Sequence, residues 1–93
     1  MMKLDYRYDE QILDLKETAN GDDFEFTLTF VDNNWKKKVE KIREYFDENN
    51  ILTDIHFYIH PNNRFQIIVR KDFYNEFLIQ LFSQQIVKEI KWI

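Results

Sequence analysis

Two histidines and a tyrosine at alternate positions come closest, in this chain, to a recognisable chemical site. His56, Tyr58 and His60 stand two residues apart, so all three share one face if the segment is a β-strand. Imidazoles bind metals and act as general acids and bases. Residues four apart on a strand, however, lie about 13 Å from each other at ~3.3 Å per residue, whereas a Zn–N bond is about 2.1 Å. We therefore predict no metal held by this strand alone, and no cofactor.

Arg70 and Glu25 form a second candidate pair, because both fall on the polar positions of predicted strands. If the two strands are neighbours, Arg70 could clamp a substrate carboxylate with its guanidinium group. The alternative is a cross-strand ion pair with Glu25, worth under about 1 kcal/mol. The sequence favours the ion pair.

Lys36, Lys37 and Lys38 place three positive charges in the first turn of a predicted helix. That arrangement opposes the helix dipole, which prefers anions at the N-terminal end. The lysines could bind an anion or an acidic partner there. The alternative, which the sequence favours, is a solvated face whose repulsion is relieved by Glu40 and Glu44 at helical spacing.

The elements that must position these residues follow from hydrophobic periodicity. Residues 24–30 alternate apolar and polar side chains strictly, which predicts a strand. Residues 35–46 place Trp35, Val39, Ile42 and Phe46 on one face of a helix, with Asp32 or Asn33 as its N-cap.

Two further alternating runs, at 55–60 and 64–70, predict a hairpin. Pairing Ile59 with Phe65 leaves a loop at 61–63, which fits a type I turn followed by left-handed Asn63. A second helix begins after Asp72 and ends near Gln84. Residues 86–93 read as a last strand.

The resulting β-α-β-β-α-β order is α+β and resembles the ferredoxin-like arrangement, an antiparallel sheet with two helices on one face. We expect a single domain over residues 1–93, with the split βαβ core at 24–93 and an N-terminal β extension at 1–23. Residues 12–17 could pair with 24–30 across a turn at Asn20-Gly21, and Leu4, Tyr6 and Tyr8 could form another strand. The pattern leaves open whether this extension widens the sheet or covers its open face.

Composition limits the class of function. The 93 residues carry a net charge of −4 and no cysteine, which opposes binding to nucleic acid or anionic membranes and favours a reducing compartment such as the cytoplasm. No apolar run is long enough to span a membrane. A single glycine excludes a phosphate-binding loop, and a single serine, Ser83, lies far from the histidines in the predicted fold.

We therefore interpret the chain as a non-enzymatic protein-interaction domain that binds itself as a homodimer, or another protein, through the open sheet face. Aromatic side chains such as Tyr58 are common at interface hot spots. The expected interaction residues are Glu25, His56, Tyr58, His60, Ile68 and Arg70.

Two other functions stay open. The first is an acidic inhibitor or immunity-type protein of a basic partner, since many carboxylates precede residue 24; these are Asp5, Asp9, Glu10, Asp14, Glu17, Asp22 and Asp23. The second is a small-ligand sensor or enzyme that uses His56, His60, Glu25 and Arg70.

Overall fold

A computed structural model describes residues 4–49 and 54–93. It confirms the α+β class, and from the third strand onward the element order is the expected β-α-β-β-α-β. In chain order the elements are β1 (Leu4–Arg7), β2 (Leu13–Asn20), β3 (Asp23–Phe30), α1 (Lys36–Glu48), β4 (Ile55–His60), β5 (Arg64–Arg70), the 3-10 turn η2 (Lys71–Phe73), α2 (Tyr74–Ser83) and β6 (Glu89–Trp92).

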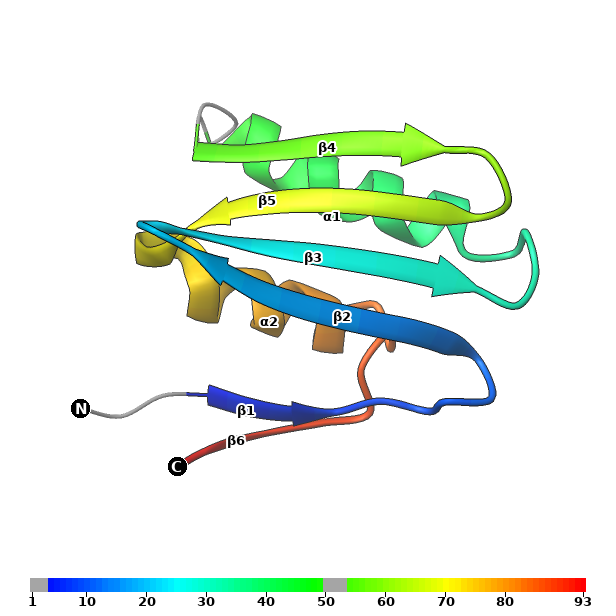
Figure 1. Ribbon diagram of the computed structural model, residues 1–93, viewed down its shortest axis with the longest axis horizontal. Coiled ribbons are helices and arrows are strands. Elements are labelled where there is room, and N and C mark those ends of the chain that lie inside the picture. Colours follow the sequence, from blue (N-terminus) through cyan, green and yellow to red (C-terminus); the bar gives the residue numbers. More distant parts are fainter. Residues whose placement is uncertain (1–3, 50–53) are drawn as a thin grey trace.

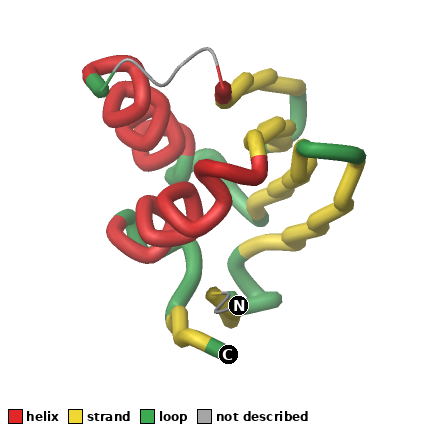
Figure 2. Tube along the Cα trace, turned by 90° about the vertical axis from the view of Figure 1, so that its left-hand side faces the viewer, coloured by secondary structure: helices red, strands yellow, loops and turns green. Residues whose placement is uncertain are grey.

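The main sheet has four antiparallel strands in the order β2-β3-β5-β4, and β1 pairs with β6 in a separate two-stranded sheet. Both helices lie on one face of the main sheet, with α1 behind β4 and β5 and α2 behind β2 and β3 (Figure 1; Figure 2). Each half of the core is thus a hairpin followed by a helix, β2-β3-α1 and β4-β5-α2. Neither described helix is long and apolar enough to cross a membrane.

The N-terminal extension widens the sheet, which answers the question that the sequence left open. β2 pairs with β3 over eight residues, from Leu13 opposite Phe30 to Asn20 opposite Asp23. It occupies the place beside β3 that the last strand takes in a ferredoxin-like sheet. The hairpin forms locally through a two-residue turn, and closing a short loop costs less entropy than a crossover from α2. Gly21 has a φ of 63°, as a type II′ turn requires at its first central residue.

The end of α2 directs the chain away from the sheet. Gln85 adopts a left-handed conformation with a φ of 62°. The backbone N–H groups of Gln85 and Ile86 donate to the carbonyls of Phe82 and Leu81, both over 2.9 Å, which is a Schellman motif. Ile86 and Val87 are buried directly after it. The last strand is therefore shorter than the 86–93 expected from the sequence, and it pairs with β1 from Leu4 opposite Trp92 to Arg7 opposite Glu89.

The β4–β5 hairpin has the expected register but a different turn. Ile59 pairs with Phe65 and His60 with Arg64, which leaves the three-residue loop. Asn63 is left-handed as expected, but Asn62 is left-handed as well, with a φ of 65°. The expected type I turn is therefore wrong, because it requires a negative φ there. Asparagine tolerates this conformation better than most residues.

The expected helix caps are also wrong. α1 begins after Trp35 and makes no side-chain cap hydrogen bond. The Asp32 carboxylate instead accepts from the N–H of Asn34 over 2.9 Å, in the turn before the helix. Asp72 lies inside the turn η2, and α2 begins after Phe73. Trp35 stacks on Phe30 at 5.3 Å between ring centroids, so aromatic packing positions the start of α1 in place of a polar cap.

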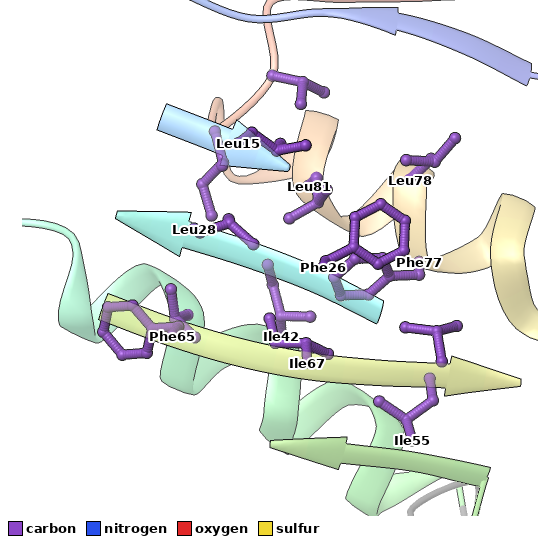
Figure 3. Packing of buried hydrophobic residues seen from close by; sticks show 14 of the residues in the cluster. Leu15, Phe26, Leu28, Ile42, Ile55, Phe65, Ile67, Phe77, Leu78 and Leu81 are labelled. Atoms are coloured by element: carbon purple, nitrogen blue, oxygen red, sulfur yellow. The ribbon is translucent and has the colours of Figure 1, made fainter. Parts of the chain in front are cut away.

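One apolar core fills the space between the helices and the sheet (Figure 3). Phe26 of β3 and Phe77 of α2 are fully buried, with ring centroids 4.8 Å apart. Ile59 departs from the pattern, because it has the core-facing parity of β4 yet is 51% exposed. Its side chain lines a depression together with Glu40, Arg43 and Asp47 of α1.

A carboxylate held by two tyrosines joins β1 to the rest of the molecule. Glu17 of β2 accepts hydrogen bonds from the hydroxyls of Tyr6 at 2.8 Å and Tyr74 at 2.9 Å. Tyr74 also stacks on Phe24 at 4.6 Å between centroids. The Tyr8 hydroxyl donates to the Leu15 carbonyl over 3.1 Å. These contacts connect β1, β2 and α2 at the edge of the sheet opposite β4.

The two aromatic residues Phe77 and Phe82 allow a matched test of the core. Phe77 is fully buried and Phe82 is 44% exposed on the same helix. We expect Phe77→Ala to lower the free energy of unfolding by about 3–5 kcal/mol, because it leaves a cavity. Phe82→Ala should cost no more than about 1 kcal/mol. Urea unfolding followed by circular dichroism measures both, and equal losses would contradict this packing.

The Glu17 cluster predicts a loss of stability at high pH. Burial, followed by the hydrogen bond to Glu17, raises the pKa of Tyr6 and of Tyr74 above the ordinary value of about 10. The unfolded chain therefore loses these protons at a lower pH than the folded chain. The stabilisation is complete below about pH 10 and is lost as the pH rises through the folded-state values. Urea unfolding at pH 9 to 12 should show the fall, and Tyr6→Phe should reduce its slope while exposed Tyr58→Phe should not.

Candidate interaction surface

The face of the main sheet opposite the helices carries the polar positions of all four strands. Strand pairing arranges them in rows across β2, β3, β5 and β4. No described segment covers this face, since β1 and β6 lie beyond β2 on the helix side (Figure 2). From one end the three complete rows are Thr18–Glu25–Ile68–His56, Lys16–Thr27–Gln66–Tyr58 and Asp14–Thr29–Arg64–His60. We call this surface the open face.

The open face brings most of the sequence-predicted residues together. His56 lies beside Ile68, which is next to Glu25 in the same row. Tyr58 lies one row away and is 49% exposed. His56 and His60 are both exposed at the two ends of β4. Together these residues form a patch with one aromatic, one aliphatic and several polar side chains.

A series of hydrogen bonds crosses the open face diagonally through Gln66, a residue that was not among the expected interaction residues. The Nε2 atom of His60 lies 3.1 Å from the Gln66 side-chain oxygen. The Gln66 amide donates in turn to the Glu25 carboxylate. Gln66 thus bridges His60 and Glu25. Its polar side chain at an alternating strand position was the only signal in the sequence, and many solvated positions share that signal.

The predicted pairing of Arg70 with Glu25 is wrong by one row. Glu25 lies opposite Ile68, and Arg70 lies opposite Asp23 at the end of the sheet. The Arg70 guanidinium forms an ion pair with Asp54, 3.5 Å from its carboxylate. Alternation along the strands determines which face a residue occupies but not the exact register between strands, so it could not separate these two arrangements.

The three lysines at the start of α1 do not converge on one point. The Lys38 ammonium lies over the Trp35 ring, 4.6 Å from its centroid. Lys36 lines a depression of about 220 Å³ with Trp35, Ile59 and His60. None of the three lysines forms an ion pair with a described residue.

Mainly polar residues line a shallow depression on the open face. The depression measures about 600 Å³ and lies over the row that ends in His60, and its lining includes Lys16, Thr27 and Arg64. Among residues 4–49 and 54–93, no group of three or more His, Asp or Glu side chains could hold a metal ion. The geometry suits contact with a broad, partly polar surface.

No protein-family model, no curated protein and no solved structure matches this chain.

The Arg70–Asp54 ion pair predicts only a small contribution to stability. The Arg70 side chain is 59% exposed, and exposed pairs are screened by solvent. We expect a double-mutant cycle of Arg70→Met and Asp54→Asn to give a coupling below about 1 kcal/mol. Unfolding in urea at low and high salt measures it. A larger, salt-insensitive coupling would show that the pair is shielded from water.

Proposed function

We propose that this chain is a non-enzymatic protein-interaction domain whose open face binds a partner protein. The observation that supports this most is the patch around Tyr58, where an exposed aromatic ring, Ile68 and His56 meet on an uncovered four-stranded surface. Tyrosine is enriched at interface hot spots, where a polar tip and an apolar ring contribute together.

The fixed positions of the polar groups also favour binding. The chain of hydrogen bonds from His60 through Gln66 to Glu25 orients these side chains before a partner arrives. Ordering side chains at an interface otherwise costs about 0.5–1.5 kcal/mol each. The proposal keeps the cytoplasm as the location expected from the cysteine-free sequence.

The alternative of an acidic inhibitor receives less support, because several of its carboxylates already have partners. Asp9 lies 3.2 Å from the Lys88 ammonium, and Asp22 lies 3.3 Å from that of Lys71. Glu17 is held by two tyrosine hydroxyls. A ligand site built on Arg70 likewise competes with Asp54.

Site-specific photo-crosslinking tests the proposed function. A photoreactive phenylalanine analogue placed at Tyr58 should form a discrete cross-linked product, heavier than the 11.6 kDa chain, in the cell from which the sequence comes. The same analogue at Phe82, which is similarly exposed but on α2, is the matched control. Ile68→Asp should abolish the Tyr58 product, because it puts a charge into the centre of the patch.

Two results of the cross-linking experiment would contradict the proposal. If positions 58 and 82 give the same products, or if Ile68→Asp leaves the Tyr58 product unchanged in a folded protein, the open face is not the binding surface. Circular dichroism of the Ile68→Asp variant confirms folding.

A further inference from the structure

The outer edge of β4 is one of the two outer edges of the main sheet, and neither edge pairs with a described strand. β4 pairs with β5 on one side, and no described strand pairs with its other side. The edge at β2, by contrast, receives the Tyr8 hydroxyl at the Leu15 carbonyl. Figure 2 shows β4 and α1 together on the side of the molecule away from both termini. A strand edge with free N–H and C=O groups is a template for another strand.

The sequence of β4 lacks the features that usually protect such an edge. Exposed edge strands generally carry lysines, other charges or a proline that discourage pairing. β4 reads Ile-His-Phe-Tyr-Ile-His and has no lysine, arginine, carboxylate, glycine or proline. β2 carries Asp14, Lys16 and Glu17. The edge at β4 is therefore suited to pairing.

Apolar side chains are exposed on both sides of this edge. Tyr58 is 49% exposed on the open face, and Ile59 is 51% exposed on the helix side. Ile59 lines a depression of about 330 Å³ between β4 and α1. A strand added at this edge would lie beside both side chains and leave the open face accessible.

α1 carries a stripe of four charges, Lys36, Glu40, Arg43 and Asp47, along the flank nearest β4. Their spacings of four, three and four residues place them on one line of the helix. Each lines a depression together with residues of β4. The opposite flank faces α2, since the Tyr45 hydroxyl donates to Glu76 of α2 over 2.6 Å.

The charges of this stripe alternate and are complementary to themselves in the antiparallel direction. When two copies of the helix run antiparallel, Lys36 of one lies opposite Asp47 of the other, and Glu40 lies opposite Arg43. All four contacts are then attractive. Within one chain, neighbouring charges of the stripe are also opposite in sign and attract at these spacings, although α1 has no acid in its first turn and no base in its last turn, against the helix dipole. The stripe is therefore complementary to a second, antiparallel copy of the helix in addition to its contacts within one helix.

We propose that a second copy of this chain binds along the β4–α1 side, which consists of the outer edge of β4 and the charged stripe of α1. The two β4 strands pair antiparallel about a twofold axis and make one eight-stranded sheet. The inference rests on the proposed function and supplies its geometry, because pairing places two open faces side by side as a single binding surface.

The spacing of the elements agrees with this arrangement. Strands in a sheet lie about 4.8 Å apart, and α1 covers β5 and β4, so the two α1 helices lie about 10 Å apart. That is the usual distance between packed helices. Arg43 lines a depression with Ile55, Phe57 and Tyr58, so the middle of the stripe and the middle of β4 lie close to the same axis.

The register of the two strands follows from the side chains that each pairing places opposite one another. Pairing centred on Phe57 places Asp54 of one copy opposite His60 of the other, whereas pairing centred on Tyr58 places His56 opposite His60. The first pairing avoids placing two histidines opposite each other, and we assign it.

The size of this side of the molecule suits an interface. The molecule measures 35 × 28 × 23 Å, so a side of 35 by 23 Å is comparable with the ~800 Å² that each partner buries in a standard interface.

Charge reversal with exchange of partners tests the arrangement. The wild-type chain should be a dimer of twice 11.6 kDa in sedimentation velocity and native mass spectrometry. Arg43→Glu and Glu40→Arg should each weaken self-association at least tenfold, because each turns attractive contacts into repulsive ones at both symmetry-related positions. Lys41→Glu and Glu48→Arg, exposed residues off the stripe, are the matched controls and should stay dimeric.

Mixing the two weakened variants gives the decisive result. An equimolar mixture of Arg43→Glu and Glu40→Arg should form a heterodimer, since all contacts at these positions become attractive again. The double variant in one chain should recover the homodimer. Changes within a single helix cannot produce recovery on mixing. Ile59→Lys should also weaken the dimer, through the strand edge and without touching the open face.

A wild-type chain that stays monomeric at about 100 μM overturns the inference, as does a dimer that Arg43→Glu and Ile59→Lys leave intact. A dimer lost on Ile68→Asp alone would assign self-association to the open face and overturn the β4–α1 geometry. Failure of the proposed function would give a different result. Positions 58 and 82 would then give the same cross-linked products, while the dimer and its response to charge reversal persist.

Discussion

The pairing of β2 with β3 is the constraint on which the rest of the structure depends. Eight residue pairs and a two-residue turn fix it locally. Once β2 lies beside β3, the chain leaving α2 finds no free edge there. The Schellman motif at Gln85 then directs it to β1 instead. The position of the extension thus determines which sheet edge is supported by further chain, which is the edge at β2 and not the edge at β4.

The two outer strands of the main sheet, β2 and β4, differ in their contacts. At β2, the Glu17 carboxylate with Tyr6 and Tyr74 ties three elements together through partly buried hydrogen bonds. At β4, the neighbouring helix offers alternating charges, and the strand offers apolar side chains. One edge is tied to the rest of the chain by these contacts, and the other is the edge at which we propose that a second copy binds.

Sequence periodicity was sufficient for the parts of the fold that depend on side-chain alternation. It predicted which side of each central strand faces the core, and hence that Glu25, His56, Tyr58 and Ile68 share the open face. It also predicted the pairing of Ile59 with Phe65. These succeed because one wrong step in register would put charges into the core.

The features that periodicity missed depend on competition between distant segments. The sequence offers both β2 and residues 86–93 as neighbours for β3, and only the cost of closing each connection decides between them. The expected pairing of Arg70 with Glu25 is one row away from the observed register of β3 and β5, and Arg70 forms an ion pair with Asp54 instead. The stripe on α1 was visible as a solvated face, yet its complementarity appears only after the flank nearest β4 is known.

The pairing of β1 with β6 has a mechanical consequence for the chain. Leu4 lies opposite Trp92, so both ends of the described chain leave from the same end of this small sheet, as Figure 1 shows. A pulling force applied through the two ends therefore opens the strand pair one hydrogen bond at a time, like a zipper. It does not load all the hydrogen bonds at once, as shearing would. Under tension the molecule yields first at β1 and β6, while the hairpins of the main sheet remain unloaded until that pair has opened.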